Sequence, residues 1–154
     1  MAGIIMHCVN AMVTPILLAL SSARIPAVAP ICLSTAWSLG LTASGADAYL
    51  LHVTTTPSVA YIARVDDFDC GIMISASHNP YYDNGIKLIN CNGEKMDEET
   101  ILLVEDYLDG KLRLFGQEWE DIPFAHKDAI GCTVDYVAGR NRYMGYLISL
   151  GVYS

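Results

Sequence analysis

The feature that most constrains this chain is a short run of consecutive apolar residues with no charge, Cys70–Ser75 (CGIMIS). Successive side chains of a strand point to opposite faces of a sheet, so a continuous apolar run needs cover on both faces. A second β-rich apolar run, Ala46–Val53, follows Gly45. Together the two runs predict parallel strands buried in an α/β domain.

The segments around these runs alternate between helical and extended patterns. Pro57 suits the first turn of a helix that covers Ser58–Arg64. Ile86–Asn90 is a third extended run, and it ends in the turn Asn92–Gly93. The order strand, helix, strand, loop, strand predicts a three-layer α/β/α domain with a mixed, mostly parallel sheet.

Two further helices are predicted downstream. Asp97 caps an acidic amphipathic helix over Glu98–Leu108. Its predicted apolar stripe consists of Ile101, Leu102, Val104, Tyr107 and Leu108. Ala129–Tyr153 is a helix-forming stretch with tyrosines spaced along it.

Length and composition limit the class of protein. A chain of 154 residues has room for one domain with a real core. Its formal charge of −8 leaves no basic face for phosphate neutralisation, which argues against nucleic acid as a partner. The five cysteines include no CxxC pair, so we expect reduced thiols in the cytoplasm rather than disulfides or a zinc site. The oligomeric state stays open.

Residues 1–39 differ in character from the rest of the chain, because Arg24 is their only side chain charged at neutral pH. Met1–Val13 lacks the basic residues of a signal peptide, and Pro15, Pro26 and Pro30 interrupt the apolar run. No stretch is long enough to span a bilayer as an unbroken helix. We therefore expect no membrane association.

The polar loop after Cys70–Ser75 holds the groups that can do chemistry. Ser75, Ser77 and His78 offer donors for an anion or a phosphoryl group, and Lys87 offers a positive charge. Gly85 suits a tight turn. Three further side chains suit loop-shaping hydrogen bonds: Asn79, Asp83 and Asn84. Taken from the residues alone, such a loop is more often simply a turn.

Longer strings in the chain carry a resemblance to a known family. ISASHNPYYDNGIKL, which begins at Ile74, resembles the phosphoserine loop of the α-D-phosphohexomutases, in the wording of phosphoglucosamine mutases. Leu41–Arg64 resembles the strand and helix before that loop, and Thr133–Leu147 resembles the end of the first domain. The resemblance implies an incomplete domain I over residues 40–132 and the start of a linker helix over residues 133–154.

The resemblance also implies an activity. Ser77 would carry the phosphoryl group and donate it to O1 of glucosamine 6-phosphate. After the 1,6-bisphosphate intermediate reorients, Ser77 would take back the phosphate of O6. His78 and Lys87 would flank the phosphoserine, and one Mg²⁺ would touch its phosphate while a later domain supplies the carboxylate ligands. Phosphomannomutase and phosphoglucomutase share this serine chemistry and are the alternatives within the class.

Some of these residues also have plain structural interpretations. Ser75 suits a scaffold role better than that of a nucleophile. His78 can serve only to hold the loop in shape through a hydrogen bond, and Lys87 can be a solvated lysine at a strand edge. A non-catalytic remnant is the alternative from another class of protein, because the later domains of the family do not follow in this chain.

The first 39 residues do not fit the resemblance. Members of the family begin with a phosphate-contacting segment and a KDTR-like loop, which are absent as written. With permitted codons for Arg24 to Leu39, the neighbouring reading frame spells KDTRRSTYMFEYSLVAG, which resembles the missing segment. We hypothesise that residues 1–39 are translated in a shifted frame, and we expect them to pack poorly against the rest.

Sequencing the DNA of the locus tests this hypothesis. We expect a one-base discrepancy upstream of the Leu41 codon and the later domains in frame downstream. An undisturbed frame through Leu41, followed by a confirmed stop, would contradict it.

Overall fold

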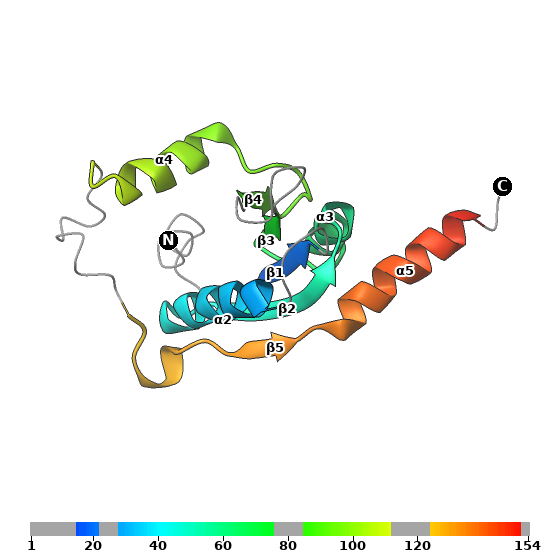
Figure 1. Cartoon of the computed structure of the whole chain (residues 1–154), viewed down its shortest axis with the longest axis horizontal. Helices are drawn as coiled ribbons and strands as arrows, with labels where there is room; N and C mark the ends of the chain where they lie inside the picture. Colours follow the sequence, from blue (N-terminus) through cyan, green and yellow to red (C-terminus); the bar gives the residue numbers. More distant parts are fainter. Residues whose placement is uncertain (1–14, 22–27, 76–84, 112–123, 152–154) are drawn as a thin grey trace.

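The computed structural model describes residues 15–21, 28–75, 85–111 and 124–151, which build a five-stranded sheet in the order β4-β3-β1-β2-β5 (Figure 1). The strands are β1 (Pro15–Ser21), β2 (Asp47–Thr54), β3 (Cys70–Ser75), β4 (Gly85–Asn90) and β5 (Thr133–Asp135). β4 pairs antiparallel with β3, and all other neighbours are parallel. The predicted mixed, mostly parallel sheet is therefore confirmed.

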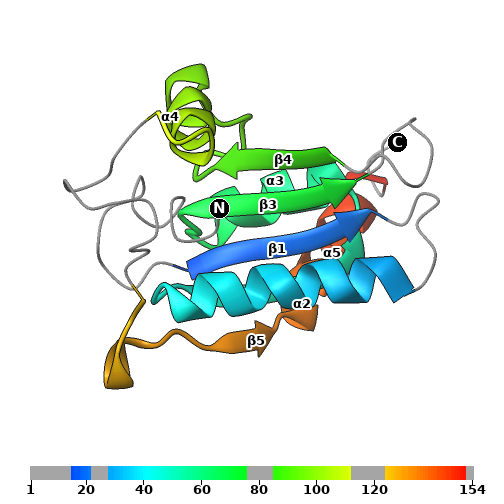
Figure 2. The same ribbon diagram turned by 60° about the vertical axis from the view of Figure 1, so that its left-hand side comes forward.

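Helices cover both faces of this sheet (Figure 2). α2 (Val28–Ala43) and α4 (Glu98–Leu108) contribute side chains to the core on one face, and α3 (Thr56–Val65) and α5 (Val137–Gly151) contribute to the core on the other. A short 3-10 helix, η1 (Lys127–Ala129), precedes β5. The three-layer α/β/α architecture is thus the predicted one.

The expectation that residues 1–39 pack poorly is wrong for the part that the structure describes. β1 is the central strand, paired along its length with β2 and partly with β3. Leu17 is fully buried and Leu18 is 1% exposed, on opposite faces of the sheet. Leu33 and Trp37 of α2 pack on the same core as Leu18. An apolar strand in this place pairs with the facing edges of both β2 and β3. Its burial says nothing about the reading frame of the DNA, so the shifted frame stays a prediction.

The predictions for the burial of β3 and for the cap of α4 are confirmed. Every residue of β3 is buried, as its apolar run indicated. Asp97 caps α4, because its Oδ1 accepts a 2.8 Å hydrogen bond from the Thr100 backbone N–H. The N–H and hydroxyl of Thr100 both donate to this carboxylate and lower the pKa of Asp97.

Close packing of α3 on β3 depends on a small residue. A Cβ atom added at Gly71 would lie 2.8 Å from Cγ1 of Val59, inside van der Waals contact. The missing side chain lets α3 lie directly against the buried strand that leads into the polar loop.

Other details of the sequence prediction are wrong. The stretch from Ala129 was expected to be helical, but Thr133–Asp135 pairs with β2 and α5 begins only at Val137. On α4, Leu102 and Leu108 are 56% and 50% exposed, so the buried stripe is narrower than predicted. β2 is not buried on both faces throughout, because a bulge beside Leu18/Ala19 turns His52 outward with a positive φ of 56°.

Two further predictions concern the cysteines and the possibility of membrane-spanning helices. Within the described ranges, Cys32, Cys70, Cys91 and Cys132 are free thiols. None of the helices in these ranges combines the length and the apolar character that crossing a bilayer requires.

The burial of β1 leads to a prediction for the free energy of unfolding. Leu18→Ala removes buried methyl groups from the central strand and should lower the free energy of unfolding by about 2–5 kcal/mol. Leu102→Ala, on the exposed side of α4, should change it by less than about 0.5 kcal/mol. Chemical denaturation of both variants measures the difference, and equal small effects would show that β1 does not carry the core.

Candidate active site

One edge of the sheet gathers the ends of four strands. Because β1, β2, β3 and β5 are parallel, their carboxyl ends meet there, and β4 begins at the same edge. Open α/β sheets place their ligand sites at this edge. The connection from β2 to α3 is short, so the first turn of α3 starts there as well.

The polar loop is held at this edge by the β3–β4 pairing. Ser75, the last residue of β3, lies opposite Gly85, the first residue of β4. Ser75 is buried, which agrees with the scaffold role predicted for it. Gly85 is extended and belongs to the strand, and a Cβ there would meet the Ser75 carbonyl oxygen at an ordinary 3.5 Å.

The loop between these anchors lies outside the described residues. It contains five of the predicted site residues, namely Ser77, His78, Asn79, Asp83 and Asn84. The structure thus fixes where the loop leaves and returns, and the roles of these five side chains stay predictions.

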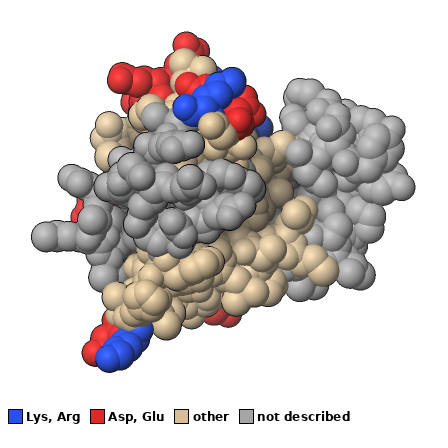
Figure 3. All heavy atoms as spheres, turned by 90° about the vertical axis from the view of Figure 1, so that its left-hand side faces the viewer, with Lys and Arg blue, Asp and Glu red and all other residues tan. Residues whose placement is uncertain are grey.

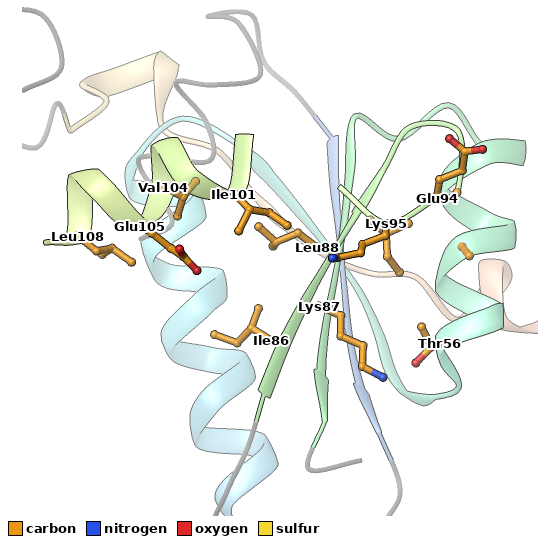
Figure 4. Close-up of a pocket in the computed structure, with 13 residues that line it drawn as sticks. Thr56, Ile86, Lys87, Leu88, Glu94, Lys95, Ile101, Val104, Glu105 and Leu108 are labelled. Carbon is orange, nitrogen blue, oxygen red and sulfur yellow. The ribbon is translucent and has the colours of Figure 1, made fainter. Parts of the chain in front are cut away.

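Lys87 lies on the α3 side of the sheet. Lys87 pairs with Met73 across the β3–β4 ladder, and Met73 belongs to the core under α3. Ile89, two residues after Lys87 on the same face of β4, belongs to that core as well. The Lys87 side chain is exposed and, together with Thr56 of the first turn of α3, lines a cavity of about 520 Å³ (Figure 4).

The cavity reaches around β4 to the other face of the sheet. There its wall is formed by β4 and α4 and is mostly apolar, with Glu105 as a charged member (Figure 4). These apolar residues are Ile86, Leu88, Ile101, Val104 and Leu108. The side with Lys87 and Thr56 offers a positive charge and a hydroxyl, so it is the candidate site.

The charge at the start of α3 favours an anion beside Lys87. Thr55 caps α3 by accepting a 3.4 Å hydrogen bond from the Ser58 backbone N–H. The free N–H groups of a helix N-terminus carry a partial positive charge, and an ammonium group nearby adds a full one. The nearest elements thus suit a phosphoryl group better than a cation.

Two acidic residues, Glu94 and Glu105, also line this cavity (Figure 4). Figure 3 shows acidic and basic side chains side by side on the face that it draws, and Lys111, just after α4, pairs through its Nζ with Asp109 at 2.7 Å and Asp106 at 3.5 Å. Asp135, at the end of β5, pairs with His52 at 2.9 Å. Among the residues that the structure describes, no three His, Cys, Asp or Glu side chains converge as metal ligands.

Reasoning from the sequence missed the contribution of α3. Thr55 and Thr56 looked like part of a turn before a helix, with no visible link to a loop that begins some twenty residues later. The rule that parallel strands end at one edge is the signal that relates them to Lys87.

Comparisons with known proteins agree with this geometry. Residues 32–112 match the profile of the family described as phosphoglucomutase/phosphomannomutase, alpha/beta/alpha domain I. Phosphoglucosamine mutases of Lachnospira eligens and Lachnoclostridium phytofermentans are 70% and 60% identical over 115 residues, and that of Caldicellulosiruptor bescii is 44% identical over 117 residues. These stretches cover 75–76% of this chain and 24% of each relative, so the chain spans about a quarter of their length.

A solved structure confirms the fold. A phosphoglucomutase/phosphomannomutase family protein from Burkholderia thailandensis superposes with a TM-score of 0.59 at 18% sequence identity. The superposition covers 92% of this chain and 28% of that protein.

Fold and site together define an α/β/α domain of the open-sheet class, with Lys87 and the N-terminus of α3 at its carboxyl edge. The chain belongs to the phosphoglucomutase/phosphomannomutase family, through domain I of that family.

Burial of β3 makes a prediction for thiol chemistry. Desolvation raises the pKa of the Cys70 thiol to about 12, whereas Cys91 is exposed in the turn after β4. Because the thiolate is the nucleophile, a maleimide at pH 8 should label Cys91 and leave Cys70 unlabelled. Peptide mass spectrometry measures both sites.

The pH dependence of stability follows from the same rise in the Cys70 pKa. Folding favours the protonated Cys70 thiol, so its contribution to stability is present below the ordinary pKa of 9.0 and is lost as pH rises toward 12. Labelling of Cys70 at the rate of Cys91 at pH 8, in folded protein, would show that β3 is not buried.

Proposed function

We propose that this domain supplies the phosphoserine loop of a phosphoglucosamine mutase, the enzyme that interconverts glucosamine 6-phosphate and glucosamine 1-phosphate. The observation that carries the proposal is the 70% identity over 115 residues to the Lachnospira eligens enzyme. The position of the loop at the carboxyl edge, between β3 and β4, supports it.

Ser77 is the proposed carrier of the phosphoryl group. In the first transfer the P–Oγ bond of phosphoserine breaks while a P–O1 bond forms on glucosamine 6-phosphate; the O1 proton passes to a base, and the released Ser77 Oγ takes up a proton. In the second transfer the P–O6 bond breaks while a P–Oγ bond forms; Ser77 Oγ gives up its proton, and O6 takes up a proton. The partial charge at the start of α3 and the Lys87 ammonium group favour the anion at both stages.

The neighbouring residues have distinct proposed roles. Lys87 stabilises charge or handles the proton at the attacking hydroxyl, which its place on the α3 side of β4 supports. His78 flanks the phosphoserine. Asn79, Asp83 and Asn84 shape the loop through hydrogen bonds to its backbone.

The described residues do not form a ligand set for a metal ion. Mg²⁺ remains a proposal for the intact enzyme, in which it would contact the phosphate on Ser77 and neutralise charge on its oxygens. The steps above are assigned only to residues of this chain.

The substrates of the proposed enzyme are phosphosugars, and glucosamine phosphates are favoured over mannose or glucose phosphates. The three curated relatives described above are all phosphoglucosamine mutases, at 44–70% identity. Such substrates serve amino-sugar and cell-wall precursor synthesis in the cytoplasm, which is where we place the protein.

Phosphorylation of Ser77 tests the proposal. Incubation with glucosamine 1,6-bisphosphate should add one phosphoryl group to the chain, which mass spectrometry of the Cys70–Lys87 region detects. Ser77→Ala should abolish the addition, and the matched Ser75→Ala should retain it. Lys87→Met should slow it by about 10²-fold or more if Lys87 acts as an acid or base.

Two further outcomes bear on the same proposal. A phosphoryl group found on Ser75 in both wild type and Ser77→Ala would assign the wrong serine. We expect no turnover of glucosamine 6-phosphate by the 154-residue chain alone in a coupled assay, because a single domain does not enclose the substrate. Turnover would show that the later domains are dispensable.

A further inference from the structure

The outer edge of β4 is only partly covered. β4 is the last strand on its side of the sheet, and the chain that follows it turns back along its outer edge. The Met96 N–H donates to the Leu88 carbonyl at 2.9 Å, and the Asn90 N–H donates to the Glu94 carbonyl at 2.8 Å. The returning chain then enters α4 at Glu98, so it covers only the second half of β4.

The first half of β4 has backbone groups that point away from β3. In an antiparallel ladder the backbone N–H and C=O groups of successive residues point to alternate edges of the strand. Because the Leu88 carbonyl points outward, the N–H and C=O of Ile86, two residues earlier, point outward as well. Within the described ranges, neither another strand nor a backbone hydrogen bond reaches Ile86 from that side. Such an edge is a template for an added strand.

One face of β4 beside this edge carries positive charge. Lys95 lies opposite Ile89 in an antiparallel bridge, so its side chain lies on the same face as Ile89 and Lys87, toward α3. Both lysines line the cavity described above (Figure 4). Among the described residues, neither lysine forms a salt bridge. The two ammonium groups are therefore available to an acidic partner.

The other face of β4 offers apolar contacts. There the side chains of Ile86 and Leu88 meet those of α4 across the cavity (Figure 4). Glu105 of α4 lines the same wall, and it would repel a carboxylate placed there. Acidic groups of a partner thus belong on the α3 face and apolar groups on the α4 face.

An extended peptide that alternates acidic and apolar residues matches this arrangement. Successive side chains of a strand point to opposite faces, so every second residue would meet the lysines and the residues between would meet the apolar wall. A second copy of the chain fits less well. If β4 paired with itself around a two-fold axis, Lys87 and Lys95 would meet the same two lysines, and like charges across a strand pair are unfavourable.

We propose that the open edge of β4 binds an extended segment of another protein that alternates acidic and apolar residues, by adding it to the sheet as a strand. Ile86 supplies the backbone N–H and C=O groups, while Lys87 and Lys95 supply the positive charge. The binding does not depend on the chemistry of Ser77, so its test does not use activity.

Fluorescence anisotropy with the complete 154-residue chain tests the proposal. The probe is a fluorescein-labelled synthetic peptide of sequence EVEVEV. The comparison peptides are KVKVKV, in which the charge is reversed, and EEEVVV, which has the same composition without alternation. EVEVEV should bind at least about tenfold more tightly than either. Equal binding of the three peptides, or no binding of EVEVEV at about 1 mM, overturns the proposal.

Ile86→Pro separates strand addition from simple binding in a cavity. Because the Ile86 N–H points away from β3, proline removes a donor at the open edge without removing a bond of the β3–β4 ladder. The variant should bind EVEVEV about tenfold more weakly or worse, and so should Lys95→Glu. The matched control is Lys111→Glu, which makes the same charge change at a lysine outside the cavity and should bind like the wild type.

Protection of the buried Cys70 thiol from maleimide shows that each variant is folded. Unchanged binding of EVEVEV to folded Ile86→Pro overturns strand addition. Self-association of the chain in sedimentation that Ile86→Pro abolishes, without binding of EVEVEV, would assign the edge to a second copy and would also overturn the proposal.

Discussion

The parallel pairing of β1 with both β2 and β3 is the interaction on which the rest of this structure depends. β1 joins the two strands that bear the predicted family sequence, and its side chains enter the cores on both faces of the sheet. Without it, β2 and β3 would each present an unpaired edge. The carboxyl edge, at which β3 ends and α3 begins, exists only because these strands run in the same direction.

The site follows from that arrangement. β3 is buried on both faces and cannot shift, and its antiparallel partner β4 returns the chain to the same edge. The loop therefore has two fixed ends, and Lys87 faces the positive end of α3 because residues alternate along β4. The phosphoryl transfer that we propose needs positioned charge more than covalent chemistry from the protein.

Helix α5 is anchored on α3 and β2. The pairing of Asp66 with Tyr136 and Arg142, together with the stacking of Tyr146 on Tyr61, fixes one side of α5 on the domain as far as Tyr146. Its second half exposes apolar side chains.

The sequence by itself determined the local elements and the family. The uninterrupted apolar run of β3, the Asp97 cap of α4 and Pro57 in the first turn of α3 are local signals, and the structure confirms them. The wording of the loop from Ile74 identified the family. Only the tertiary structure decided that Pro15–Ser21 is the central strand, that Thr133–Asp135 is an edge strand and that Leu102 and Leu108 face outward. These outcomes depend on which strand edges and helix faces find partners far away in the chain, and local composition carries no record of that choice.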